Sequence, residues 1–152
     1  MLSTNCIDES MQLVPRNDWE WSPGKRIGPI TLGDRVDNYL YSLRLIAQEH
    51  DYDVGETWTR YRSPSWDISI LTVNDRITSV RCPSCVFRGK SLIGLSELEL
   101  VSELGTFNCE AWNHALGRIL EFDELGLEAH LDDGIVTAVT VSIDPDTIAS
   151  DA

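Results

Sequence analysis

One stretch of the chain decides the expected fold: Asp75-Arg76-Ile77-Thr78-Ser79-Val80, which recurs as Gly134-Ile135-Val136-Thr137-Ala138-Val139. Each of the two stretches begins at a turn signal. Further upstream, Asp34-Arg35-Val36 matches Ser96-Glu97-Leu98 at a closely similar spacing. Similar spacings at the two ends predict one unit of about sixty residues that is used twice. The alternative is that two unrelated amphipathic segments merely resemble each other.

Helical patterns precede the strands in each copy. Over 34–47, Asp34 stands where an N-cap belongs, and the apolar residues that follow are spaced as one buried face. Over 96–104, Ser96 and Glu99 have the spacing of a capping box, and Gly105 provides a stop. A further helix is expected over 111–120, with Trp112 on its apolar side.

Alternating and β-branched segments predict strands over 56–62, 65–72, 76–82, 125–131 and 135–143. The expected fold class is α+β: an antiparallel sheet with helices packed on one face, built from two tandem α-β-β(-β) modules. The expected division is a loop-rich lead-in over 1–29, a first module over 30–90, a second over 91–143 and a polar tail over 144–152.

Charge excludes several classes of partner. The chain has 12 basic and 25 acidic residues, which gives a formal net charge of −13. Nucleic acids and anionic membrane surfaces are bound by clustered Lys and Arg, so neither is an expected partner. A basic protein remains a fitting partner. The N-terminus lacks the basic and apolar regions of a secretory signal, and no apolar run reaches the length of a membrane span. A cytoplasmic protein is therefore expected.

The one chemically suggestive short motif is Cys82-Pro83-Ser84-Cys85. A redox function would need a helix start after it, which the following residues do not provide. A zinc site would need further ligands, for which Cys109 and His114 are candidates. The simplest interpretation is a pair of reduced thiols in a loop. Because recognisable catalytic and phosphate-binding motifs are absent from the sequence, no enzyme, cofactor or metal is expected.

A resemblance enters at Gly28-Pro29-Ile30-Thr31-Leu32-Gly33-Asp34, and its latter half returns at Leu125–Val136. Over roughly 27–143 the chain resembles bacterial immunity proteins of contact-dependent inhibition and other polymorphic toxin systems. The resemblance implies a protein that binds and neutralises one cognate toxin domain, many of which are basic nucleases. In outline, the tandem modules also look like the β-lactamase inhibitory protein architecture.

The expected partner-binding residues are aromatic and acidic. Trp58 alternates with arginines on the polar side of a strand, where aromatic side chains ringed by charge are typical of interfaces. The candidates are Trp58, Tyr61, Glu121, Asp123, Glu124, Glu128, Asp132 and Asp133. Two alternatives stay open: a zinc- or thiol-dependent protein centred on Cys82 and Cys85, and a module that binds a small molecule or a peptide on the free sheet face.

Overall fold

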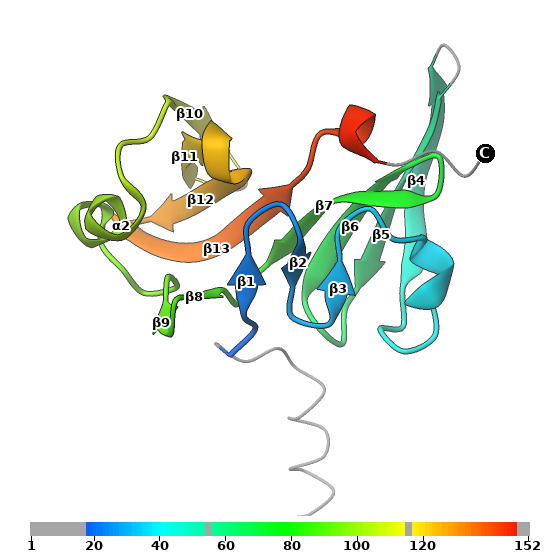
Figure 1. Ribbon diagram of the computed structural model, residues 1–152, viewed down its shortest axis with the longest axis horizontal. Coiled ribbons are helices and arrows are strands. Elements are labelled where there is room, and N and C mark those ends of the chain that lie inside the picture. The colour runs from blue at the N-terminus through cyan, green and yellow to red at the C-terminus, as the bar shows by residue number, and fades with distance from the viewer. Residues whose placement is uncertain (1–17, 54–55, 115–116, 149–152) are drawn as a thin grey trace, which may run out of the picture.

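A computed structural model describes residues 18–53, 56–114 and 117–148. Its largest element is one eight-stranded antiparallel sheet with the strand order β10-β11-β12-β13-β7-β6-β5-β4 (Figure 1). The first four strands of this sheet in sequence are β4 (Ile46–Asp53), β5 (Glu56–Ser63), β6 (Ile68–Val73) and β7 (Arg76–Cys82). The other four are β10 (Cys109–Asn113), β11 (Gly117–Phe122), β12 (Leu127–Asp132) and β13 (Ile135–Ser142). Two four-stranded meanders are thus joined edge to edge by the pairing of β7 with β13.

The two meanders repeat the same irregularity. The register of β6 and β7 shifts between Leu71 and Thr72, and that of β12 and β13 shifts between His130 and Leu131, at the corresponding place in the second copy. At each bulge the extra residue is a threonine. Thr78 Oγ1 donates to the carbonyl oxygen of Leu71 at 3.2 Å, and Thr137 Oγ1 donates to that of His130 at 3.3 Å. A bulge increases local twist, so both meanders bend at the same place.

The turns that precede these bulges also correspond. Asn74 and Asp75 connect β6 to β7 with φ of 52° and 67°, and Asp133 and Gly134 connect β12 to β13 with φ of 54° and 78°. Positive φ at both central residues is the mark of a two-residue turn whose twist matches that of the strands. The aligned stretches therefore occupy corresponding positions in the two meanders.

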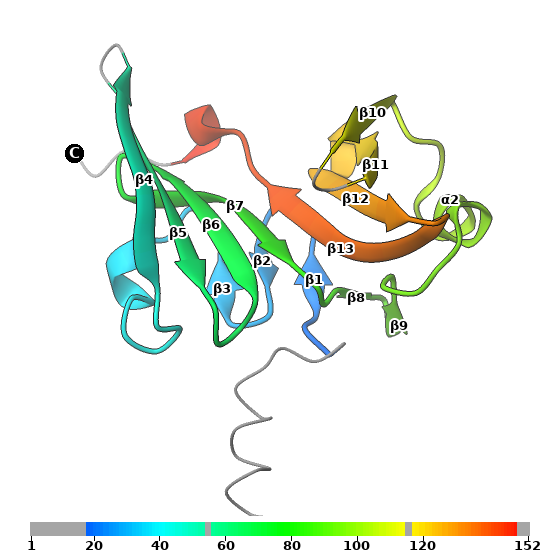
Figure 2. The same ribbon diagram turned by 180° about the vertical axis from the view of Figure 1, so that it is seen from behind.

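Small β elements cover one face of the large sheet. The sheet of β1 (Trp21–Ser22), β2 (Arg26–Ile27) and β3 (Ile30–Thr31) lies in front of the first meander in Figure 1 and behind it in Figure 2. The hairpin of β8 (Val86–Phe87) and β9 (Lys90–Ser91) precedes the second meander in the same way. The amide of Leu32 donates to the carbonyl oxygen of Lys25, and the amide of Leu92 donates to that of Cys85, both at 2.8 Å. The covering hairpins thus correspond as the meanders do.

Helical structure is limited to one α-helix and three single turns in the described part of the chain. Helix α2 (Glu97–Leu104) begins with the expected capping box between Ser96 and Glu99, and it places Leu100 in the core. The turns are 3₁₀ helices: η1 (Val36–Asn38), η2 (Asp123–Leu125) and η3 (Pro145–Thr147). The expected α+β class with helices on the sheet is therefore wrong, because the fold is mostly β.

The first expected helix is replaced by a turn and an edge strand. Within 34–47 only η1 and a few further turns form, after which Ile46 begins β4. The Asp34 carboxylate accepts hydrogen bonds from the Tyr39 hydroxyl at 2.9 Å and from the Asn38 amide group at 3.2 Å instead of capping a long helix. Arg44 then adopts φ of 54°, which ends the helical path. Pairing with β5 gives the following residues a non-local partner, and such tertiary context overrides weak local propensity.

The helix expected over 111–120 is also wrong. Cys109–Asn113 form β10 and Gly117–Phe122 form β11, while residues 115–116 lie outside the described residues; Trp112 is 74% exposed on β10 instead of packing in the core. The reversal requires Gly117, which has φ of 80°, and a Cβ there would lie 2.6 Å from the carbonyl oxygen of Leu131. In so short a segment, the spacing of the apolar residues does not distinguish a helix from two short strands. The expected strands over 56–62, 76–82 and 135–143 are confirmed, with only small differences at their ends.

Burial alternates along the central strands. In β6, Ile68, Ile70 and Thr72 are buried, whereas the residues between them are half-buried. The buried side faces the small sheets, where Trp19 packs on Trp66 and Trp21 packs on Phe87 at centroid distances of 5.6 and 5.0 Å. No described element lies over the opposite side, which we call the uncovered face.

Candidate functional site

A single row of side chains crosses the uncovered face. Strand register places these residues side by side: Arg62 on β5, Ser69 on β6, Arg81 on β7, Thr140 on β13, Glu128 on β12 and Glu121 on β11. We call these six residues the charged row. Its arginines belong to the first meander and its glutamates to the second, so charge changes sign across the β7–β13 junction.

The first-meander half is basic and partly aromatic. Arg60 and Arg62 are exposed on β5, and Arg60 Nε lies 3.4 Å from Glu49 Oε1 of β4. Trp58 is on the same face of β5, opposite Val73 of β6, and it is half-buried. An indole beside arginines combines a large contact area with charge, which is typical of interface anchors.

The second-meander half is acidic. Glu121 and Glu128 lie directly opposite each other on adjacent strands, an arrangement in which like charges repel. Burial raises the pKa of Glu128, and the carboxylates of Glu121 and Asp123 raise it further. This pair costs stability in the free protein. A cationic group of a partner would relieve the repulsion.

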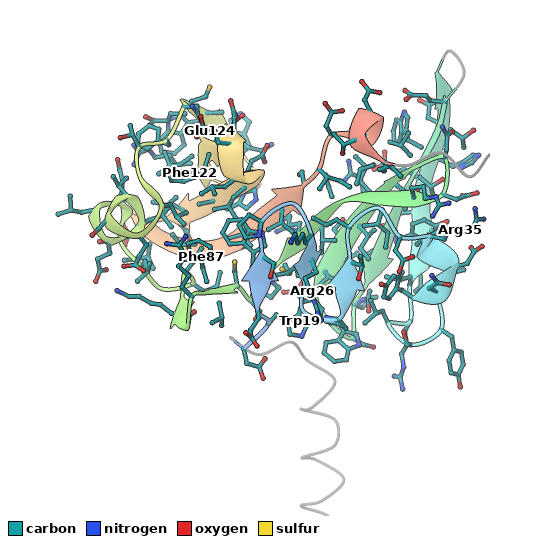
Figure 3. The ribbon with its side chains drawn as sticks, viewed as in Figure 1. Trp19, Arg26, Arg35, Phe87, Phe122 and Glu124 are labelled. Carbon is teal, nitrogen blue, oxygen red and sulfur yellow. The ribbon has the colours of Figure 1, made fainter. Side chains whose placement is uncertain are left out.

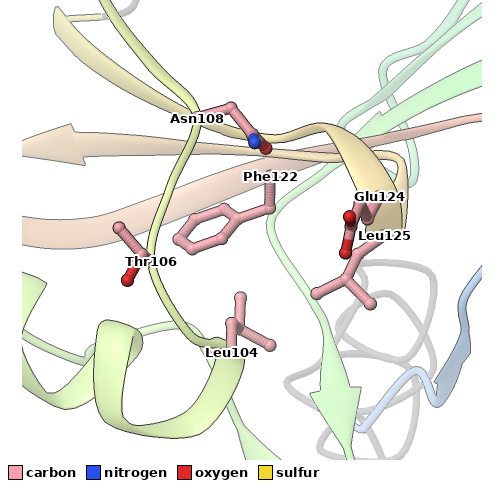
Figure 4. A pocket seen from close by; sticks show the side chains of 6 residues that line it. All are labelled: Leu104, Thr106, Asn108, Phe122, Glu124 and Leu125. Carbon is pink, nitrogen blue, oxygen red and sulfur yellow. The ribbon is translucent and has the colours of Figure 1, made fainter.

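Asp123 and Glu124 extend the acidic half onto η2. The side-chain oxygen of Asn108 accepts a hydrogen bond from the backbone amide of Asp123 at 2.7 Å, which fixes the start of η2 against the segment before β10. Glu124 and Leu125 line two hollows, of about 250 and about 490 Å³. Figure 4 shows the smaller hollow, with Phe122 and Leu104 among its walls. Figure 3 places Phe122 and Glu124 at the second meander, far from Arg35 at the first.

The centre of the uncovered face holds a buried polar group. His130, on β12, is 2% exposed, and its Nε2 lies 2.8 Å from Thr140 Oγ1. Burial lowers the pKa of His130 to about 4, and the positive charge of Arg81 contributes. Two atoms here, His130 Nδ1 and Arg81 Nε, are buried without a hydrogen-bond partner among the described residues. Buried polar atoms are nearly always paired in folded proteins, so this exception needs an explanation.

The structure separates the residues expected to act together. Glu121, Asp123, Glu124 and Glu128 lie in one area, whereas Asp132 and Asp133 lie at the far end of β12, in the turn to β13. Trp58 is on the uncovered face. Tyr61 is on the covered side, opposite the core residue Ile70, and burial raises the pKa of its hydroxyl together with Asp75 and Asp37.

Sequence reasoning missed Arg62, Arg81, His130 and Thr140. These residues come from four different strands, and only strand register brings them into one area. Alternation along the predicted strands placed Arg62 and His130 on the polar side, but it assigned no face to Arg81 or Thr140. The sequence did not reveal the order of the strands in the sheet, in which β7 lies next to β13.

The cysteine motif belongs to the core. Cys82 and Cys85 are 1% and 0% exposed, and Cys82 Sγ lies 3.1 Å from the carbonyl oxygen of Ser84. Burial raises the pKa of Cys82 to about 12 and raises that of Cys85 as well. Thiols of this kind are poor nucleophiles at neutral pH. Cys109 is exposed on β10 and His114 is exposed beyond it. Within the described ranges, no three His, Cys, Asp or Glu residues form a group that could hold a metal ion.

Comparison with protein-family models, with curated proteins and with solved structures finds no match for the chain. In the part of the chain that the structure describes, no helix has the length and apolar character needed to cross a membrane.

Proposed function

We propose that this chain is a non-enzymatic inhibitor in the bacterial cytoplasm that binds and neutralises one toxin domain through its uncovered sheet face. The observation that carries the proposal is the charged row, which divides an uncovered eight-stranded face into a basic and an acidic half. The resemblance of the sequence to immunity proteins supports the class of partner.

The dimensions of the face fit a protein partner. Neighbouring strands are about 4.8 Å apart, so eight strands span roughly 34 Å. A specific protein interface covers about 800 Å² on each partner, which is a patch of comparable width. The two hollows beside η2 are smaller and lie on the covered side, where their walls include the core residue Phe122 in one and Pro23 and Gly24 of the β1–β2 turn in the other. A large ligand surface therefore matches the geometry better than a small molecule does.

Charge supports a basic partner. The net charge of −13 steers a basic domain toward the chain, and the Glu121–Glu128 pair offers it carboxylates that are already positioned. Toxin domains that cleave nucleic acid need a basic surface for phosphate, and an acidic face laid over that surface would block it. Trp58 supplies an apolar anchor at the other end of the face.

Co-expression tests the function. The product of the neighbouring gene is expressed with and without this chain, and growth and copurification are measured. We expect the product to be toxic alone, harmless with this chain, and recovered with it as a complex. A neighbour that is neither toxic nor bound would overturn the proposal.

Two double variants that remove the same number of charges test where on the protein the toxin binds. Glu121→Gln with Glu128→Gln and Asp132→Asn with Asp133→Asn each remove two negative charges. We expect the first pair to weaken toxin binding about tenfold more than the second, because Glu121 and Glu128 are neighbours in the charged row, whereas Asp132 and Asp133 lie at the far end of β12 and in the turn to β13. The Asp132 and Asp133 changes should slow association mainly at low salt. Equal losses would assign the effect to net charge alone.

A further inference from the structure

We propose that Arg81, His130 and Thr140 form a carboxylate-binding site at the centre of the uncovered face, and that it receives an acidic side chain of the partner. The identity of the partner rests on the proposed function. The affinity of the site for a carboxylate does not, because it depends only on residues of this chain.

Register and one hydrogen bond bring the three side chains together. Arg81 lies directly opposite Thr140 across the β7–β13 junction. His130 belongs to the next strand and reaches diagonally to Thr140, with 2.8 Å between Nε2 and Oγ1. Each of the three residues is flanked in its strand by buried core residues, so its side chain is on the uncovered face.

Both atoms without a partner can act as donors. Arg81 Nε always carries a hydrogen. If the Thr140 hydroxyl donates to His130 Nε2, the imidazole hydrogen is on Nδ1, which then also donates. Two buried donors beside a guanidinium charge are satisfied together by the two oxygens of one carboxylate.

The chain does not supply that carboxylate from its described residues. Glu128 lies on the far side of Thr140 from Arg81, and its repulsive neighbours are Glu121 and Asp123. Arg81 forms no ion pair with any residue in the described ranges. Arg62, two strands away along the charged row, adds positive potential on the opposite side. An acidic side chain from outside the described chain fits this environment.

The charge of the whole molecule favours a carboxylate over a phosphate. At −13, the chain repels a dianion more strongly than a monoanion, and Glu128 is only one strand beyond Thr140. The partner would then meet two complementary features on one face. Its basic groups would face Glu121 and Glu128, and one carboxylate would enter between Arg81 and His130. Acidic and basic groups placed side by side on one face determine the orientation of the bound partner as well as its affinity.

Acetate is the probe for the isolated full-length chain. The Nε–H signal of Arg81 and the imidazole signals of His130 are followed by ¹⁵N nuclear magnetic resonance during titration with sodium acetate. Sodium chloride at matched ionic strength and inorganic phosphate are separate arms. We expect saturable shifts of both residues with acetate, and smaller or unsaturable shifts with chloride and phosphate.

Variants assign the shifts to the site. Arg81→Gln should abolish the saturable shift of His130, and Arg60→Gln, which changes an exposed arginine on the same face, should leave it intact. Unchanged signals in acetate would overturn the proposal, since the two atoms would then be satisfied by water or by the rest of the chain. Saturation by phosphate with no response to acetate would overturn it as well.

Measuring toxin binding by the variants tests this inference separately from the proposed function. Arg81→Gln should weaken toxin binding by about 10- to 100-fold, because a buried charge-assisted hydrogen bond is lost, whereas Arg88→Gln, which changes an exposed arginine between β8 and β9 on the covered side, should change it less than about threefold. A toxin that binds Arg81→Gln as tightly as the wild type overturns the inference and leaves the proposed function standing. Acetate binding by a chain that protects against no toxin supports the site and overturns the proposed function.

Discussion

Arg62 and Glu121 hold corresponding positions in the two meanders and carry opposite charge. Arg62 lies opposite Ser69 on the uncovered face, and Glu121 lies opposite Glu128 at the equivalent place in the second copy. Five strand spacings, about 24 Å, separate them along the charged row. Corresponding residues on the covered face stay apolar, as Ile77 and Val136 do. The two copies thus share a core and differ in the surface that can contact a partner.

Removing the repulsion between the paired glutamates should stabilise the protein. Glu128→Gln should raise the free energy of unfolding by about 0.5 kcal/mol at pH 7, because Glu128 faces Glu121 directly. Its folded-state pKa is raised, so the penalty is present at neutral pH and fades as pH falls. Urea unfolding at pH 7 measures the difference. Glu110→Gln is the control and should destabilise, because Arg118 Nε lies 2.6 Å from Glu110 Oε2.

Stability should depend on pH through His130. Its pKa is lowered from 6.5 to about 4 in the folded protein. Between these two pH values the imidazole is therefore protonated mainly in the unfolded state. The contribution is fully present above pH 6.5 and is lost as pH falls toward 4, on the order of 3 kcal/mol. His130→Gln should flatten this part of the stability curve, whatever its effect at pH 7. A His130→Gln curve that keeps the full loss of stability between pH 6.5 and 4 would contradict the prediction.

A methyl group at Gly117 should cost more than one at Gly134. The two glycines have nearly equal φ, 80° and 78°, so alanine meets similar backbone strain at each. At Gly117 the new Cβ also approaches the carbonyl oxygen of Leu131 to 2.6 Å, whereas at Gly134 it meets open space. We expect losses of about 3 kcal/mol for Gly117→Ala and about 1 kcal/mol for Gly134→Ala, from thermal or urea unfolding. Similar losses would show that β11 can shift away from Leu131.

The three cysteine thiols that the structure describes should react in two classes. Cys109 is exposed and should be alkylated by iodoacetamide within minutes in the native protein, whereas the buried Cys82 and Cys85 should be protected. Their raised pKa values add to the protection, since only thiolates react. Peptide mass spectrometry after timed labelling measures each site. Rapid native labelling of Cys82 or Cys85 would revive a thiol-dependent function.

The strands around the bulges were predictable because their signals are local. The β-branched stretch from Ile77 and its repeat at Val136 identify β7 and β13, and Ser96 with Glu99 identifies the start of α2. The helix expected after Asp34 does not form, because its apolar spacing also suits a single turn that delivers the chain to β4. There, pairing with β5 decided the structure, and no residue within 34–47 encodes that partner.

By itself, the sequence determined the repeated unit, the main strands, the capped helix and the acidity that disfavours nucleic-acid partners, because each depends on neighbouring residues or on composition. The tertiary structure decided which side chains share a surface. Only the pairing of β7 with β13 places Arg81 opposite Thr140 and next to His130, and only the covering hairpins decide which sheet face stays open. These are contacts between residues far apart in the chain, so they follow from the packing of the whole core rather than from any local pattern.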